Sequence, residues 1–206
     1  MCSSDLPLLL ACGALVSELR TVLTASHLDD AVDVRYLPAN LHNRPERIVP
    51  ELRALLDELD PAGTRPTLLG YADCGTGGHL DALLAERPHV RRLPGAHCYE
   101  FFAGSARFHE LHDDEPGTLY LTDFLAKHFE ALLWQGLGLD RHPELLPVYF
   151  GNYTRVVLLS QQPSADVLDR GRDAATRLGL SFHHEPVGLS PFAEAVAVNL
   201  PSRKAA

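Results

Sequence analysis

The apolar residues of this chain alternate between short extended runs and stretches with helical spacing. Residues 8–11 form an apolar run that predicts a buried strand, and residues 14–24 follow with leucines at helical spacing. Residues 32–37 (VDVRYL) alternate between apolar and polar positions, as a half-buried strand does, and residues 48–59 carry the apolar stripe of an amphipathic helix. This alternation of strands and helices predicts an α/β fold with parallel sheet(s) flanked by helices.

The order of strand, turn, helix and strand occurs three times along the chain. It spans about residues 8–62, 66–104 and 155–198, and we interpret these as three degenerate βαβ repeats with right-handed connections. The first two repeats share a short motif, because VRYLPANLH and VRRLPGAHC both read Val-Arg-x-Leu-Pro before a turn with a histidine, His42 or His97.

A helical insertion is predicted between the second and third repeats, at about residues 105–150. An aromatic-rich helix is expected over residues 99–112, and a second helix over residues 121–134 with Thr122 as its N-cap. With this insertion, residues 1–206 are predicted to form a single α/β domain.

Composition and charge exclude several classes of partner. The chain has 206 residues, 46% of them hydrophobic, and a formal net charge of −9, with its lysines and arginines scattered. Nucleic-acid binding requires clustered basic residues, so we expect no nucleic-acid partner. No apolar run reaches the roughly 20 residues of a membrane helix, so we expect no membrane partner. The N-terminus has no basic segment before its apolar run and carries Asp5, so the sequence favours a cytoplasmic protein.

The cysteines give the most specific chemical signal. Cys12 and Cys74 each follow a predicted strand and precede a glycine, and Cys98 lies where the next strand ends. Thiolates gathered at one sheet edge would form a soft-ligand site for Zn²⁺ or an iron–sulfur cluster. No Cys-x-x-Cys pair is present, so such a site would have to be assembled by the fold. The alternative is that each cysteine is a small buried hydrophobe.

His97 and Glu100 flank Cys98 and are candidate catalytic residues. The imidazole of His97 could bind a ligand or move a proton, and the carboxylate of Glu100 could act as a general base or orient a ligand. The alternative is that this segment is the start of a helix with a capping carboxylate.

The glycine turn after the third predicted strand is a candidate cofactor-binding loop. The backbone amides of Gly75, Thr76, Gly77 and Gly78 could hold an anion. The turn matches neither the dinucleotide fingerprint nor the phosphate-binding loop with its lysine. The alternative is a tight turn that needs glycine for positive φ angles.

Several longer motifs resemble a known prokaryotic family, domain-of-unknown-function family 1638. The resemblance rests on CGAL, LHNRPE, GYADCGTGG, HCYEFF, YLTDFLAKHFE, LGLDRHPEL and YFGNYTRVV, and it extends from about residue 8 to residue 190. Some members of that family lie beside corrinoid-dependent methyltransferase systems, which implies one-carbon or thiol methyl chemistry and a corrinoid or methyltransferase partner. The resemblance implies that Cys12, Cys74, Cys98, His97 and Glu100 are motif positions, whereas Gln161 occupies the corresponding turn of the third repeat.

The sequence therefore predicts a metal-thiolate protein. We expect a zinc-dependent enzyme that activates a thiol or water for a small-molecule substrate, in methyl transfer or corrinoid-linked metabolism. The alternatives are an iron–sulfur enzyme, a non-catalytic protein that binds or delivers a metal or cofactor, and a metal-free enzyme with Cys74 as nucleophile and His97 as base.

Overall fold

The computed structural model describes residues 6–201, so Cys2 lies outside the described part of the chain. The chain groups into two compact units, each with its own parallel sheet. Of the described residues, 6–101 and 192–201 belong to unit 1, and 102–191 belong to unit 2. Among the helices of residues 6–201, none has both the length and the apolar composition needed to cross a lipid bilayer.

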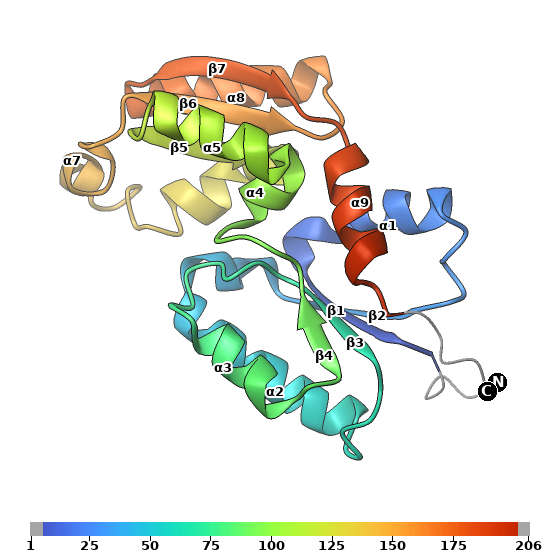
Figure 1. Ribbon diagram of the computed structural model, residues 1–206. Helices are drawn as coiled ribbons and strands as arrows, with labels where there is room; N and C mark the ends of the chain where they lie inside the picture. Colours follow the sequence, from blue (N-terminus) through green and yellow to red (C-terminus); the bar gives the residue numbers. More distant parts are fainter. Residues whose placement is uncertain (1–5, 202–206) are drawn as a thin grey trace. The chain divides into compact units, whose positions relative to one another are not determined.

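Unit 1 is built on a four-stranded sheet in the order β2-β1-β3-β4, with every neighbouring pair parallel. Figure 1 shows helices α2 and α3 on one face of this sheet and α1 and α9 on the other. The elements are β1 (Leu8–Cys12), η2 (Gly13–Leu15), α1 (Val16–Ala25), β2 (Asp33–Leu37), η3 (Ala39–Asn43), η4 (Pro45–Arg47), α2 (Ile48–Leu59), β3 (Thr67–Gly70), α3 (His79–Glu86), β4 (Val90–Arg92) and α9 (Ser190–Asn199), with α4 (Cys98–Ala103) at the end of the first segment.

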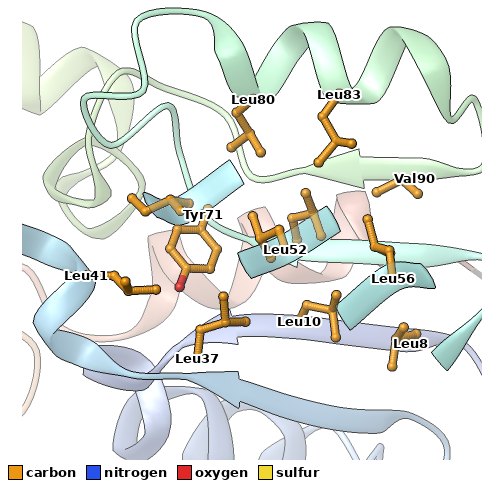
Figure 2. Close-up of a cluster of buried hydrophobic side chains, with 12 residues drawn as sticks. Leu8, Leu10, Leu37, Leu41, Leu52, Leu56, Tyr71, Leu80, Leu83 and Val90 are labelled. Atoms are coloured by element: carbon orange, nitrogen blue, oxygen red, sulfur yellow. The ribbon is translucent and has the colours of Figure 1, made fainter. Parts of the chain in front are cut away.

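The core of unit 1 follows from the two-residue period of the strands. Leu8 and Leu10 of β1 point to the same face and pack against Leu52 and Leu56 of α2 (Figure 2). The residue between them, Leu9, is buried as well, because helices cover both faces of the sheet. Continuous apolar runs such as residues 8–11 are typical of strands in such a sheet.

A buried ion pair connects the start of β2 with the segment before β3. The Nη2 atom of Arg65 lies 2.8 Å from Oδ2 of Asp33, and both side chains are less than 10% exposed. The Arg65 guanidinium also donates through Nε to the carbonyl of Leu6, at 2.6 Å. Arg65 therefore joins three segments at the amino edge of the sheet.

Unit 2 is built on a three-stranded parallel sheet in the order β5-β6-β7. The longest helix, α8, packs against β6 and β7 at Gly171, where a Cβ atom would come within 2.9 Å of the Phe182 ring and 3.0 Å of the Leu158 side chain. The elements are α5 (Ser105–Asp114), β5 (Thr118–Thr122), α6 (Asp123–Lys127), the π-helix η5 (Glu130–Trp134), η6 (Pro143–Leu145), α7 (Leu146–Phe150), β6 (Arg155–Ser160), α8 (Ala165–Leu178) and β7 (Ser181–Pro186).

The predicted fold class is confirmed, since both sheets are parallel and flanked by helices. The three-repeat organisation is not confirmed, because the strands form two sheets. The sequence predicted one domain over residues 1–206, whereas the contacts group the chain into two units.

Residues 105–150, predicted to form a helical insertion, contain mainly helices and one strand, β5, that the prediction missed. Alternating Thr118, Tyr120 and Thr122 favour an extended strand, and the helix starts only after Thr122. Thr122 is the N-cap, as predicted, and its hydroxyl accepts a hydrogen bond from the amide of Leu125. The helix predicted over residues 99–112 is divided into α4 and α5 at Gly104, which has a φ of 78°.

We predict that Arg65→Met lowers the free energy of unfolding by about 3 kcal/mol, because it removes one member of a buried ion pair. The expected loss is at the lower end of the usual range, since Arg35 also lies 2.5 Å from Asp33 and can partly compensate its charge. Urea unfolding followed by circular dichroism measures the difference. The exposed ion pair between Arg170 and Asp166 provides the control, and Arg170→Met should leave the midpoint unchanged. Equal midpoints for both variants would contradict the structural role of Arg65.

Candidate functional site at the carboxyl edge of the first sheet

The four parallel strands of unit 1 end at the same edge of the sheet, where open α/β folds commonly bind ligands. Each strand is followed there by a side chain capable of metal, thiol or acid–base chemistry. Cys12 ends β1, His42 lies in η3 after β2, Tyr71 and Cys74 follow β3, and His97 and Cys98 follow β4.

Backbone hydrogen bonds hold the Cys74 turn against the loop that leads to Cys98. The amide of Asp73 donates to the carbonyl of Gly95 at 3.1 Å, and the amide of Cys74 donates to the carbonyl of Ala96 at 2.8 Å. The amide of Cys98 in turn stabilises the thiolate form of Cys74. These bonds extend the contact between β3 and β4 beyond the strands and bring two cysteines together.

The three cysteines are free thiols, each partly buried. Burial raises the pKa of all three, and the charges of the neighbouring cysteines raise the pKa of Cys74 and Cys98 further. The pKa of Cys74 rises to about 12, and the pKa of Cys98 lies well above its ordinary value. The pKa of Cys12 is raised by burial, against the opposing effect of the Ala14 amide and the Tyr71 hydroxyl. Without a cation, the thiols are therefore neutral at physiological pH.

The structure thus brings Cys12, Cys74 and Cys98 within electrostatic reach of one another, although they are far apart in sequence. Within residues 6–201, however, no group of three or more histidine, cysteine, aspartate or glutamate side chains is arranged to hold a metal ion. The thiols are close enough to affect one another's pKa, but they are not arranged around a common ion.

His97 and His42 are both solvent-exposed residues of the loops at this edge. Neighbouring protein atoms lower the pKa of His42 by desolvation, and the charge of His97 lowers it further, so the two imidazoles are close enough to interact. The motif shared by the first two repeats placed these histidines at equivalent turns, and the structure brings both to the same edge.

Glu100 has the geometry of the capping carboxylate, which was the alternative to a general base. Its Oε2 accepts a hydrogen bond from the amide of Ala96 at 3.0 Å, and its own amide donates to the carbonyl of His97. The carboxylate lies so close to Gly95 that a Cβ atom there would come within 2.6 Å of Oε2. Glu100 therefore holds the loop that carries His97 and Cys98.

The glycine turn binds an anion, and this anion is the carboxylate of Asp73 from the same turn. The carboxylate of Asp73 accepts hydrogen bonds from the Thr76 hydroxyl at 2.6 Å and from the amides of Gly77 and Gly78 at 3.2 and 3.0 Å. Burial opposes ionisation of Asp73, but these hydrogen bonds lower its pKa overall. The predicted cofactor-binding amides of Gly77 and Gly78 are thus already paired within the loop.

Backbone conformation explains why this turn needs glycines. Cys74 has a φ of 51°, a left-handed conformation that is uncommon for a residue with a side chain, and Gly75, Gly77 and Gly78 also have positive φ. The hydrogen bonds to Asp73 offset the cost of holding Cys74 in this conformation.

The sequence pattern did not identify Tyr71 as a site residue, because it fits a buried strand equally well. It is 2% exposed, and its buried hydroxyl lies near Cys12, whose thiolate form it stabilises. Burial and the charges of Cys12 and Cys74 raise its pKa far above the ordinary value. The available signal was its position two residues after Leu69, which places it on the same face of the sheet as that buried leucine.

A cavity of about 440 Å³ lies beside the glycine turn, between α2 and α3. Its lining combines apolar side chains with the ion pair between Arg53 and Glu86. Its lining residues are Pro45, Glu46, Val49, Pro50, Arg53, Thr76, His79, Ala82, Leu83 and Glu86.

The carboxyl edge of the second sheet has different chemistry, since residues 102–191 contain no cysteine. Gln161 is buried, and its amide oxygen accepts a hydrogen bond from the amide of Asp123 at 3.1 Å. The amide of Gln162 donates to Asp123, and Oγ of Ser160 lies 2.7 Å from Nε2 of His184. These contacts connect the ends of the strands and offer no soft metal ligand.

We predict that Asp73→Ala lowers the free energy of unfolding by about 1 to 2 kcal/mol at neutral pH, because the turn loses its internal acceptor. The lowered pKa of Asp73 means that its stabilisation is complete above the unfolded value of about 3.9 and is lost as the pH falls through the folded pKa. The difference between the wild type and the variant should therefore shrink below about pH 4. Thermal unfolding between pH 3 and 7 tests this, with the exposed Asp169→Ala as control. A difference that stays constant with pH would show that the carboxylate is not the stabilising group.

Comparison with known proteins gives a family and no close relative. No curated protein and no solved structure matches the chain. A family model matches residues 36–196, a range that includes Cys74, His97, Cys98 and Glu100 but not Cys12. Because the match covers well over half of the chain, this protein belongs to the family described as Protein of unknown function (DUF1638).

Proposed function

We propose that this protein binds a thiophilic metal ion, Zn²⁺ in the first instance, through Cys12, Cys74 and Cys98, and that the bound metal activates a thiol or water. The observation that carries the proposal is the meeting of three thiols from three separate segments at the carboxyl edge of one parallel sheet. Two of them, Cys74 and Cys98, are held together by backbone hydrogen bonds between their loops.

The electrostatics of the three thiols support a cation at this site. Each thiolate is disfavoured by burial, and the negative charges of neighbouring thiolates disfavour Cys74 and Cys98 further. A divalent cation would remove this repulsion and replace the thiol protons, as metal binding to cysteines does. If Cys12, Cys74 and Cys98 held Zn²⁺, the site would still have room for a substrate or water, which the metal would activate.

The same electrostatics argue against the metal-free thiol enzyme. A nucleophilic cysteine needs a lowered pKa, because the thiolate is the reactive form. The pKa of Cys74 is instead raised to about 12, so His97 would have to remove a strongly held proton. A bound metal ion would instead stabilise the thiolate form directly.

The residues around the thiols have roles consistent with this proposal. His42 and His97 are exposed residues of the loops at the same edge, and their imidazoles would be able to move protons to and from a bound thiol or water. Glu100 contributes by fixing the loop of Cys98, since its carboxylate accepts the amide of Ala96. The methyl-transfer reaction and a corrinoid or methyltransferase partner are expectations from the family resemblance alone.

Metal content of freshly purified protein tests the proposal. We expect about one equivalent of zinc per chain, and single substitutions Cys12→Ala, Cys74→Ala and Cys98→Ala should each reduce it to below a tenth of that value, because each removes one of three ligands. Inductively coupled plasma mass spectrometry gives the stoichiometry. Cys2→Ser is the matched control, since it removes a cysteine outside the proposed ligand set and should leave the metal content unchanged.

The possible outcomes separate the candidate functions. Iron with visible charge-transfer absorption would replace zinc with an iron–sulfur cluster on the same ligands. Full metal occupancy without turnover of any methyl donor would favour a metal-delivery protein. Protein without stoichiometric metal, with all three thiols freely titratable, would refute the metal site.

A further inference from the structure

Cys74 has a backbone conformation that a cysteine adopts only at a cost. Its φ is 51°, in the left-handed region, and Gly75, Gly77 and Gly78 of the same turn also have positive φ. A glycine at position 74 would adopt this conformation without the steric penalty that a Cβ atom brings. Residues held in such conformations cluster at functional sites, which indicates that the side chain of Cys74 has a role.

The backbone places the thiol of Cys74 beside the thiol of Cys98. The amide of Cys74 donates at 2.8 Å to the carbonyl of Ala96, which lies two residues before Cys98, and the amide of Asp73 donates to the carbonyl of Gly95 at 3.1 Å. The amide of Cys98 stabilises the thiolate forms of both Cys74 and Cys98, so the two sulfur atoms lie beside one N–H group. The two thiols are therefore a pair, although they come from loops that follow different strands.

The third thiol of this edge, Cys12, has other partners. Its sulfur interacts with the amide of Ala14, two residues further along the chain, and with the hydroxyl of Tyr71, which follows the neighbouring strand β3. Neither partner belongs to the loop that carries Cys98. Among the three thiols, Cys74 and Cys98 are thus the two that share an amide, and they are the pair best placed to react with each other.

We propose that Cys74 and Cys98 are a redox-active pair that forms a disulfide bond by exchange with a small-molecule disulfide, such as oxidised glutathione. In the first step, the thiolate of one cysteine attacks the reagent, forms a mixed disulfide and releases one thiol. In the second step, the other cysteine attacks the mixed disulfide, forms the bond between Cys74 and Cys98 and releases the second thiol. The two cysteines are oxidised and the reagent is reduced to two thiols, which carry the two protons that the cysteines lose.

This exchange requires access for a small reagent and no metal ion. Both cysteines are free thiols that are only partly buried, so a small disulfide can reach them. Burial raises the pKa of both thiols, which keeps the thiolate scarce at neutral pH and makes the exchange slow. The inference does not depend on the proposed function, although the bond would remove two of the three proposed metal ligands.

The test treats the folded Cys2→Ser protein, which retains only these three cysteines, with excess oxidised glutathione in the presence of a metal chelator. Mass spectrometry of the whole protein should show the loss of two hydrogen atoms and no attached glutathione. Tryptic digestion without reduction then identifies the bond, because arginines separate Cys12, Cys74 and Cys98 into different peptides. The expected crosslinked pair contains Cys74 and Cys98.

Three further substitutions in the same protein test the pairing. Cys74→Ala and Cys98→Ala should each form no internal disulfide and should retain glutathione on the remaining cysteine of the pair, because the second attacking thiol is absent. Cys12→Ala should form the bond at the same rate as its parent.

The opposite results would overturn the proposal. A crosslinked peptide that contains Cys12, or a glutathione adduct that persists on the parent protein, would show that Cys74 and Cys98 do not react with each other. Thiols that stay unmodified in the folded protein, while the urea-unfolded protein reacts completely under the same conditions, would show that the fold prevents the exchange.

Discussion

The parallel pairing of β1 with β2 and β3 is the constraint on which the rest of unit 1 depends. Parallel strands end at a common edge, so one set of hydrogen bonds fixes both the core and the positions of the residues beyond the strands. Cys12 is itself a paired residue of this ladder, opposite Leu37. A shift of β1 by one residue would exchange its two faces and turn Cys12 away from Tyr71.

The loops at this edge are conformationally costly, and the sheet alone does not hold them. Cys74 adopts a left-handed conformation, and the turn around it is stabilised by the carboxylate of Asp73. The loop before Cys98 is held by Glu100 in a similar way, through the amide of Ala96. The carboxylates of Asp73 and Glu100, which could be mistaken for catalytic groups, therefore accept backbone hydrogen bonds that stabilise these loops. The thiols and imidazoles are left as the groups available for chemistry.

Much of this arrangement could be predicted from the sequence, because it depends on local patterns. Apolar runs and helical spacing gave the α/β class, and the turns after the strands identified Cys12, Cys74 and Cys98 as residues of one edge. The strand β5 was missed because Leu121 and the apolar residues after it also fit helical spacing, so only the pairing of β5 with β6 decides between the two.

The role of Asp73 could not be inferred from the sequence, because residue types alone do not show whether a glycine turn binds an external anion or a carboxylate of its own. The neighbours of Tyr71 were equally inaccessible, since they depend on the register between β1 and β3, which are separated by more than fifty residues. Long-range pairing is therefore the information that was missing in both cases.

Helix α9 returns the chain to unit 1 after the whole of unit 2, and the ring of Phe192 stacks on that of Phe101 with centroids 5.4 Å apart. Phe101 is three residues beyond Cys98 in the same short helix, α4. During synthesis, which proceeds from the N-terminus, the last cysteine of the site leaves the ribosome long before the residue against which its helix is packed. The contact that covers α4 can therefore form only after residue 192 has emerged, although the three sulfur atoms of the site precede residue 100.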